Sequence, residues 1–443
     1  MDSRRTFVTH MIGLIATPVL LSGCRRSSQP EDEARKPVDP GLAPEPLGSP
    51  LPQIEPILRV RVFRVREPAV TITLGEEGRP FRARYLGYEG TGLDLSGPLT
   101  VSWGLRKWII QEADGRVTRV EADDELELTT IDNLPILLEP RGRRYPGSIR
   151  LHRRSDEGEG AFDVINHVAL ESYLPGVLAS ELFSHWRRET YLAQAVAARS
   201  FACSEQAYFS TRRHYDLTDT ISSQVYAGTV DRRVAYQAVR ETRGVVLSYD
   251  ERLVPGYYSS CCGGLASRAV DVIGPSPINR IAPLNGRSEP DVCTEAPVYE
   301  WKVRRKADEF RKRLVAYGEY RQITSLASLE SLASIELDET NPHGRPVSFQ
   351  LVDANGKSFR LDAEKLMRAA NFSNDDITAP RETLKSSFVT VTFENGDLVF
   401  AGHGFGHGSG LCQYGAEKLS RSGKSFQEIL TWYYPGASLL ESY

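Results

Sequence analysis

The first part of the chain contains short runs in which apolar and polar side chains alternate. From Leu58 the apolar positions recur at every second residue, at Val60 and Val62, and short β-rich runs separated by glycine and proline continue to Pro140. A period of two predicts strands with one buried face. We therefore expect a small β-rich domain over residues 57–142.

Farther along, the pattern changes to a helical period. The stretch 186–208 is rich in alanine, and Leu192, Val196, Arg199 and Cys203 follow the spacing i, i+4, i+7, i+11. This spacing places the four residues on one face of a helix. The stretch is therefore predicted to be one long helix with a buried face.

Turn residues predict hairpins and a late helix in the remaining sequence. An Asn-Gly pair accepts positive φ at both central positions of a tight turn, and Ser-x-x-Glu is a capping box that opens a helix. With the long helix, these elements predict an α+β fold for a domain over residues 143–443. The predicted pairs of strands are 148–154 with 161–166, 245–249 with 253–258, 347–352 with 358–361 around Asn355-Gly356, and 388–393 with 398–400 around Asn395-Gly396; the capping box is Ser425 to Glu428, before a helix ending near Tyr433.

The N-terminal sequence predicts export. Arg4 and Arg5 precede an apolar run, Met11–Leu21, of about 11 residues, which is too short to span a bilayer of about 30 Å as a helix. The run ends in Leu-Ser-Gly before Cys24, which resembles a bacterial lipoprotein signal, 1–24, with Cys24 as the lipidated residue. The paired arginines also resemble a twin-arginine signal, and the Sec route stays open.

A proline-rich stretch follows the predicted signal. Residues 25–56 contain eight prolines and no aromatic residue. Such a composition buries too little apolar surface to order itself, and its prolines stiffen it. We expect a disordered tether between a membrane anchor and the folded chain.

Length and charge limit the classes of function. The chain has 443 residues, enough for two or three domains, and Lys+Arg 54 against Asp+Glu 58 gives a net charge of -4. There is no basic stripe of the kind that binds phosphate backbones. Nucleic acid is therefore excluded as the expected partner.

The cysteines give a mixed signal. With Cys24 lipidated, five cysteines remain, an odd number, so they cannot all pair within one chain. Vicinal Cys261 and Cys262 are too close to bond each other readily, and we take Cys262 with Cys293 as the candidate disulfide. The sequence has no C-x-x-C pair of the kind typical of zinc sites, and we expect no metal and no cofactor.

Two segments carry charged residues among apolar neighbours. Glu181 follows Val177 and Leu178, and a carboxyl group in partly apolar surroundings has the raised pKa that a general acid needs near neutral pH. The alternative is an ordinary surface glutamate. Arg199 lies on the apolar helix face and needs an acidic or carbonyl partner, so a structural ion pair is an equal alternative to a cleft residue.

Two further segments are rich in polar groups and glycine. In the stretch 402–415, glycine alternates with His403 and His407, which allows close backbone approach to a ligand. No Gly-Lys-Ser/Thr follows, so the stretch is not a nucleotide loop, and its glycines disfavour the helix that would place both histidines on one metal. The stretch 214–228 is polar and aromatic, as in a cleft wall or an ordinary loop.

Taken together and in this order, the motifs resemble the stage II sporulation protein D family (SpoIID/LytB domain) from about Tyr145 to the end of the chain. The resemblance lies in specific blocks of sequence, which are Leu-Glu-Ser-Tyr-Leu-Pro-Gly-Val at 170–177, the position of Glu181, Gln-Ala-Val-Ala-Ala-Arg-Ser at 194–200, Ser-Gln-Val-Tyr-Ala-Gly at 223–228, Gly263-Gly264, and Gly-His-Gly-x-Gly-x-x-Gln-Tyr-Gly-Ala at 406–416.

The resemblance implies action on the cell wall. Sporulation members of the family are lytic transglycosylases that cut peptidoglycan strands lacking stem peptides, and others are described as enhancers of an autolytic N-acetylmuramoyl-L-alanine amidase. By position, Glu181 would be the general acid/base. Residues that would bind the glycan strand are Arg199, Ser200, Gln224, Tyr226, His403, His407, Gln413 and Tyr414.

The sequence departs from the family at two places. Many members have Lys where Leu192 stands, and some bind zinc through His and Cys where this chain has Thr218, Ser222 and Ser223. We therefore expect no zinc at the second place, although His214 remains. The expected protein is an exported, lipid-anchored lytic transglycosylase facing the periplasm or cell wall. The competing hypotheses are a non-catalytic wall-binding module or amidase enhancer, and a zinc hydrolase using His403 and His407.

Overall fold

A computed structural model describes residues 48–66, 71–85, 92–121 and 125–443. These residues form two compact units. The main unit comprises residues 48–259, 275–286 and 409–443, and the inserted unit comprises residues 260–274 and 287–408. The predicted signal, with Cys24, lies outside the described residues.

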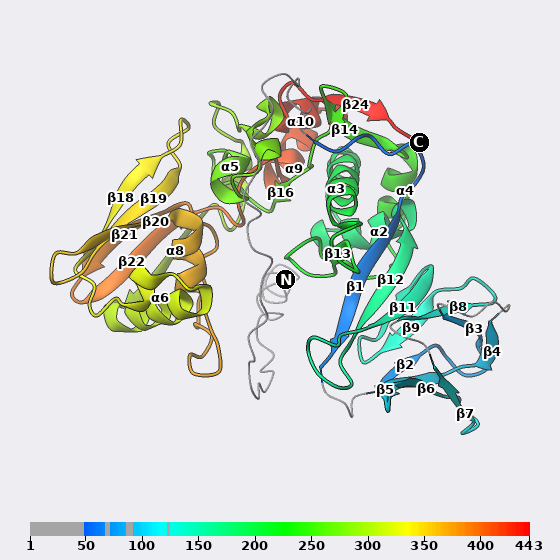
Figure 1. Ribbon diagram of the computed structural model, residues 1–443. Coiled ribbons are helices and arrows are strands. Elements are labelled where there is room, and N and C mark those ends of the chain that lie inside the picture. Colours follow the sequence, from blue (N-terminus) through cyan, green and yellow to red (C-terminus); the bar gives the residue numbers. More distant parts are fainter. Residues whose placement is uncertain (1–47, 67–70, 86–91, 122–124) are drawn as a thin grey trace, which may run out of the picture. The chain divides into compact units, whose positions relative to one another are not determined.

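Two sheets form the first part of the main unit (Figure 1). One has seven strands in the order β13-β1-β12-β11-β8-β3-β4, and the other has six in the order β10-β9-β2-β5-β6-β7. The bounds are β1 Ile57–Val65, β2 Ile72–Leu74, β3 Pro80–Tyr85, β4 Leu93–Ser96, β5 Leu99–Gly104, β6 Lys107–Gln111, β7 Val117–Val120, β8 Glu125–Thr130, β9 Ile136–Glu139, β10 Arg143–Tyr145, β11 Ser148–Arg153, β12 Phe162–Ala169 and β13 Leu217–Thr218.

Strand β1 shows how the alternation of apolar residues becomes a sheet. Its buried side chains include Leu58, Val60 and Val62, as the period of two requires. The register with β12 then shifts between Arg61 and Phe63. Such a bulge inserts one extra residue, so the alternation of buried and exposed side chains is interrupted. The next buried residue is Val65.

Helices and short strands complete the main unit. Helix α3 contacts α2, α4, α9 and α10, and α2, α3 and α4 are drawn together in green and teal in Figure 1. The predicted helix face is confirmed, because Leu192, Val196, Arg199 and Cys203 are all buried. The bounds are α2 Leu170–Glu181, α3 Arg188–Phe209, α4 Arg233–Glu241, β14 Val245–Tyr249, β15 Arg252–Leu253, β16 Tyr258–Ser259, η1 Pro277–Arg280, η2 Ala282–Leu284, β23 Leu411–Cys412, α9 Gln413–Arg421, α10 Phe426–Tyr433 and β24 Ser438–Glu441.

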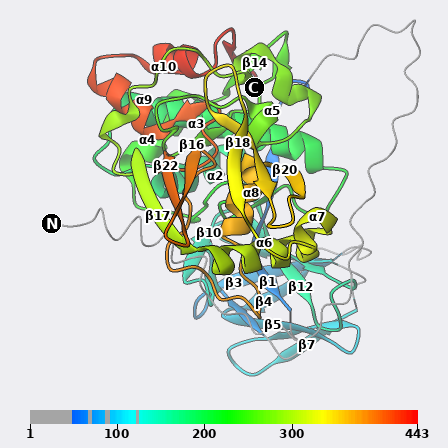
Figure 2. The ribbon, with the colours of Figure 1, turned by 90° about the vertical axis from the view of Figure 1, so that its left-hand side faces the viewer.

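The inserted unit has its own hydrophobic core between two three-stranded sheets and the helices α6 and α8. These two helices contact each other and lie side by side in Figure 2. The core includes Phe310, Leu314, Phe349, Leu366 and Phe400. The bounds are α5 Ala269–Val272, η3 Cys293–Glu295, β17 Glu300–Lys306, α6 Ala307–Arg321, α7 Thr324–Ala327, β18 Ser334–Thr340, β19 Pro346–Val352, β20 Ser358–Asp362, α8 Ala363–Ala370, β21 Val389–Glu394 and β22 Asp397–His403.

The predicted turns form, but the predicted strand 253–258 does not, because β15 covers only Arg252–Leu253 and Tyr258 belongs to β16. The hairpins β11–β12, β14–β15, β19–β20 and β21–β22 are all antiparallel. Asn395 and Gly396 both have positive φ, 54° and 82°. The capping box at the start of α10 is complete, since the Ser425 and Glu428 side chains each accept a backbone N–H of the other residue.

The arrangement of domains differs from the sequence prediction. The predicted β domain, 57–142, does not end at residue 142 as a separate body, because β1 pairs with β12 and β8 pairs with β11. The predicted domain 143–443 is interrupted by the inserted unit. The end of the predicted tether, 48–56, packs on the main unit, where Ser49 accepts the Leu253 N–H at 2.9 Å; the tether's earlier residues lie outside the described part.

No helix among the described residues has both the length and the apolar character needed to cross a membrane.

Candidate active site

Glu181 is the last residue of α2, and only 9% of its surface is exposed. Its two carboxyl oxygens accept hydrogen bonds from different elements. The Val225 backbone N–H donates to Oε1 at 3.2 Å, and Gln413 Nε2, at the start of α9, donates to Oε2 at 3.2 Å. The predicted site residues Glu181 and Gln413 are therefore in direct contact.

A short parallel pair of strands brings another polar group to Glu181. Strands β16 and β23 pair in parallel, so Tyr258 in β16 arrives beside Gln413, which follows β23. The Tyr258 hydroxyl hydrogen-bonds Glu181 and accepts from Gln224 Nε2 at 3.0 Å. Gln224 Oε1 accepts from the Tyr173 hydroxyl at 3.2 Å. The carboxyl group is thus the end of a buried chain of hydrogen bonds.

The surroundings of Glu181 favour its protonated form. Burial raises the pKa of Glu181, and the hydrogen bonds from Val225, Gln413 and Tyr258 oppose that shift without cancelling it. Its place at the C-terminal end of a helix acts in the same direction as burial, because carbonyl dipoles there repel a negative charge. A carboxyl group with a raised pKa can donate a proton near neutral pH.

Aromatic side chains lie close in the sequence to Glu181 and Gln413, and their rings pack together. Tyr414 follows Gln413, and its ring lies 5.2 Å from that of Trp186 and 6.2 Å from that of Phe183. Phe183 is two residues beyond Glu181 and is partly exposed. Aromatic rings of this kind offer apolar faces to sugar rings.

Tyr226 and Gln224 are buried and pack among the residues that surround Glu181. The Tyr226 ring lies 4.5 Å from the Tyr173 ring, and its hydroxyl donates to Asn166 Oδ1 at 3.1 Å. Gly176 in α2 lies against the segment that follows Tyr226, because a Cβ at Gly176 would be 2.3 Å from the Gly228 carbonyl oxygen. In this structure the two residues contact protein groups, and their predicted binding of glycan stays a prediction.

Arg199 forms the buried ion pair that the sequence offered as an alternative. Its side chain is 0% exposed, and its Nε and Nη2 each lie 2.8 Å from a Glu171 carboxyl oxygen. Its other contacts include the carbonyl oxygens of Val239 and Val245. The neighbouring Ser200 is also buried, and its hydroxyl accepts the Leu247 N–H at 2.9 Å. This geometry favours a structural role for both residues over contact with a glycan.

His403 and His407 belong to the inserted unit. His403 ends β22, and its ring lies 5.0 Å from that of Phe388. The segment that follows is not helical, and its glycines, among them Gly404 and Gly406, have positive φ of 76° and 95°. A Cβ at Gly404 would lie 2.5 Å from the Cys261 carbonyl oxygen, so close backbone approach explains the glycine there.

The stretch 214–228 has two parts with different surroundings. His214 lines a polar cavity of about 450 Å³, where its Nε2 lies 2.8 Å from Asp163 and its ring stacks on His152 at 3.9 Å. The Thr218 and Ser222 hydroxyls, at positions that resemble zinc ligands of other members, instead bond each other at 2.7 Å. The residues lining the cavity are Arg64, His152, Arg153, Arg154, Ser155, Asp156, Arg213, His214 and Tyr215.

Sequence reasoning missed Tyr258. No spacing connects Tyr258 to Glu181, because their proximity depends on the pairing of two-residue strands. Helix α2, which ends in Glu181, begins at Leu170 and has Pro175 inside it. The proline lacks the N–H that would bond the Glu171 carbonyl, and the helix continues nevertheless to Glu181 because packing fixes it.

Comparison with known proteins finds a family model that matches part of the chain. A family model described as SpoIID, stage II sporulation protein, matches residues 158–249, from within the β11–β12 turn to the end of β14. An uncharacterized protein of Brachyspira hyodysenteriae is 27% identical over 301 residues, which cover 68% of this chain and 73% of that protein.

Two relatives from bacilli have descriptive names. The amidase enhancer of Bacillus subtilis is 26% identical over 290 residues, 60% of this chain and 40% of the relative. Stage II sporulation protein D of Bacillus amyloliquefaciens is 24% identical over 320 residues, 69% of this chain and 82% of the relative. Residues 158–249 thus match the SpoIID family model, and the similarity to these two relatives covers 60% and 69% of the chain.

Proposed function

We propose that the chain is a lytic transglycosylase that cleaves peptidoglycan glycan strands stripped of stem peptides, with Glu181 as its single acid/base. The observation that supports this most directly is the buried Glu181 carboxyl group, whose pKa is raised and whose oxygens are held by Val225, Gln413 and Tyr258. We further propose that the protein is exported and anchored through a lipid on Cys24, facing the periplasm or cell wall.

One carboxyl group is enough for this reaction. Protonated Glu181 donates its proton to the glycosidic oxygen as the bond from that oxygen to muramic acid C1 breaks. The resulting carboxylate then takes the proton of the muramic acid C6 hydroxyl, and O6 bonds to C1. The products are a free 4-hydroxyl group and a 1,6-anhydro end. Glu181 regains its proton, and no water is consumed, in contrast to two-carboxylate hydrolases.

Neighbouring groups can hold the strand during these steps. Gln413 fixes one carboxyl oxygen, which leaves the group in a defined orientation. The rings of Tyr414, which follows Gln413, and of Phe183, two residues after Glu181, can stack on sugars. Gln224 and Tyr226 contact residues of the hydrogen-bond chain that ends at Glu181, and their binding of glycan stays part of the prediction.

The second candidate is a non-catalytic enhancer of a cell-wall amidase. It is favoured by the name of the Bacillus subtilis relative, of which this chain matches 40%. In that case Glu181 would have a purely structural role, and an amidase would be the partner.

Mass spectrometry of reaction products separates the two candidates. Wild type, Glu181→Gln and a matched control, Glu205→Gln, are incubated with purified glycan strands that lack stem peptides. Glu205 is a suitable control because burial also raises the pKa of this carboxyl group, to about 7, and it lies on α3. Circular dichroism establishes that each variant is folded.

We expect anhydro-muramic ends from wild type and Glu205→Gln and none from Glu181→Gln. New reducing ends that depend on Glu181 would instead mean hydrolysis. If no form cleaves the strands while all bind them, the transglycosylase proposal is refuted and the enhancer is favoured.

A further inference from the structure

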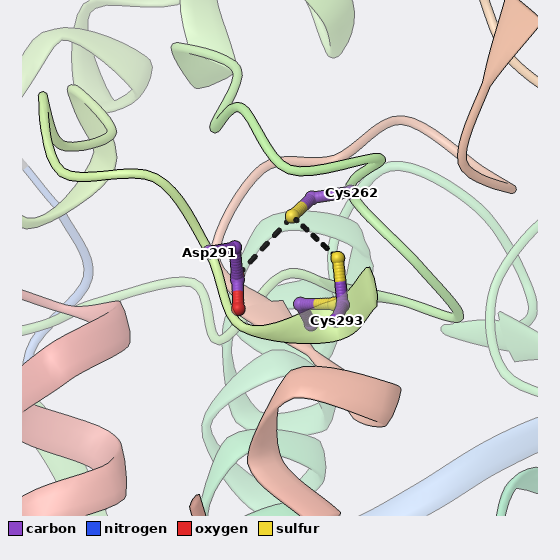
Figure 3. A group of neighbouring side chains, drawn as sticks. Cys262, Asp291 and Cys293 are labelled. Atoms are coloured by element: carbon purple, nitrogen blue, oxygen red, sulfur yellow. Dashed lines mark hydrogen bonds between the residues drawn. The ribbon is translucent and has the colours of Figure 1, made fainter. Parts of the chain in front are cut away.

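The inserted unit contains a cluster of two thiols and a carboxyl group that the proposed function does not use. Cys262, Asp291 and Cys293 are buried, and their ligand atoms all lie within 4.8 Å of one another. Cys262 Sγ lies 3.1 Å from Asp291 Oδ2 and 3.6 Å from Cys293 Sγ. Figure 3 shows the Cys262 sulfur atom joined by dashed lines to Asp291 and to the Cys293 sulfur atom.

We propose that Cys262, Asp291 and Cys293 bind a thiophilic divalent metal ion, Zn²⁺ by preference. Thiolates select soft metals, and a carboxylate oxygen is a normal additional zinc ligand. Zn–S bonds of about 2.3 Å in a tetrahedral site separate two sulfur atoms by about 3.8 Å. The observed separation, 3.6 Å, is close to that tetrahedral edge, whereas a disulfide needs about 2.05 Å.

Charge balance permits a metal ion at this buried place. Zn²⁺ would replace the two thiol protons, so binding leaves the net charge of the cluster unchanged. The Asp291 carboxylate keeps its own counter-charge, because Arg287 Nη2 lies 2.5 Å from Oδ2. The Val292 N–H donates to Oδ1 at 2.7 Å and so orients the carboxylate, as groups around metal ligands commonly do.

The site would hold together segments that are distant in the sequence. Cys262 directly precedes Gly263, where a Cβ would lie 2.7 Å from the His403 backbone. The adjacent Cys261 exchanges two backbone hydrogen bonds with Phe405, at 3.1 and 2.7 Å. A metal at Cys262 therefore fixes the backbone that supports the first part of the histidine- and glycine-rich loop.

The candidate disulfide from the sequence joins the same two cysteines, so the two hypotheses exclude each other. Sulfur atoms joined in a disulfide cannot act as thiolate ligands. A search for C-x-x-C pairs could not find this site, because Cys262 and Cys293 are 31 residues apart in the sequence.

Metal binding by the purified full chain tests the proposal without any glycan assay. We expect about one zinc per chain by elemental analysis in wild type and in Cys203→Ser, a control at a buried cysteine of α3. Cys262→Ser and Cys293→Ser should lose the metal, and Asp291→Asn should bind at least tenfold more weakly. Replacement by Co²⁺ should give thiolate-to-cobalt charge-transfer absorption in wild type that both cysteine variants lose.

A measurement on wild type alone covers the case in which the variants do not fold. Zinc should protect Cys262 and Cys293 from alkylation, as read by peptide mass spectrometry, and a strong chelator should remove that protection. Equal alkylation with and without zinc would overturn the proposal. A Cys262–Cys293 disulfide that persists in protein exported by its host, with no bound metal, would also overturn it.

Discussion

The buried ion pair between Arg199 and Glu171 allows a stability prediction that also decides what Arg199 does. Replacing Arg199 with methionine keeps an unbranched apolar stem but removes the cation, while Glu171 stays buried with 8% of its side chain exposed. Breaking such a pair by removing one partner costs about 3–5 kcal/mol. Because the Tyr443 hydroxyl and the Gly244 N–H still donate to Glu171, we expect the lower end of that range.

The acid dependence of the variant gives a second readout. Burial raises the pKa of Glu171, but hydrogen bonding and charge from Arg199 outweigh it, and the pKa is lowered overall. A lowered pKa stabilises the wild type above the unfolded value of about 4.3, and that stability is lost as pH falls through the folded value. Without Arg199, the hydrogen bonds from Tyr443 and Gly244 still oppose the effect of burial, but the largest opposing contribution is gone. The pKa of Glu171 in the folded variant is then higher than in wild type, so the difference in stability between the two should shrink as pH falls.

Urea unfolding followed by circular dichroism measures both effects. The double variant Glu171→Gln/Arg199→Met serves as the control, since it removes both charges and should recover part of the lost stability. Glycan binding per folded molecule should be unchanged in Arg199→Met. If Arg199→Met had the same unfolding midpoint as wild type but no longer bound glycan, a structural role for Arg199 would be refuted. Arg199 would then be a glycan-binding residue.

Three other predictions concern single sites. Gly176→Ala should destabilise the chain by about 1–3 kcal/mol in urea unfolding, because its Cβ would lie 2.3 Å from the Gly228 carbonyl oxygen; an unchanged midpoint would contradict that contact. Ser425→Ala should cost about 1 kcal/mol by loss of the capping box before α10, and Thr at this position should restore most of it. Burial raises the pKa of Glu205 to about 7, so wild type should lose stability as pH rises through 7, and Glu205→Gln should be the more stable form at pH 8 with a flatter pH profile.

Local signals predicted much of the fold. The face of α3, the Asn395-Gly396 turn and the cap at Ser425 depend on residues within one or two turns of each other, so the sequence pattern contains the information. The place of β1 was not predictable in this way. Its partners β12 and β13 lie far along the chain, and alternation predicts a strand without saying what it pairs with.

The same distinction applies to the site. The apolar neighbours of Glu181 indicated partly apolar surroundings but left a surface glutamate open, and Gln413 was among the expected site residues. Tyr258 was missed because it reaches Glu181 only through the pairing of β16 with β23. Arg199 remained ambiguous because its partner Glu171 lies 28 residues away, and a helix pattern cannot identify such a partner.

The position of β1 in the seven-stranded sheet decides where this protein can be shortened. The family match begins at residue 158, within the turn before β12, but β1 lies between β12 and β13. A chain that began at residue 143 or 158 would lack β1. The buried strand β12, which leads into α2, would then have an edge of unpaired backbone N–H and C=O groups. Such an edge recruits other chains and aggregates. A soluble fragment for crystallography or activity assays therefore has to begin before Ile57, well upstream of the sequence by which the family is recognised.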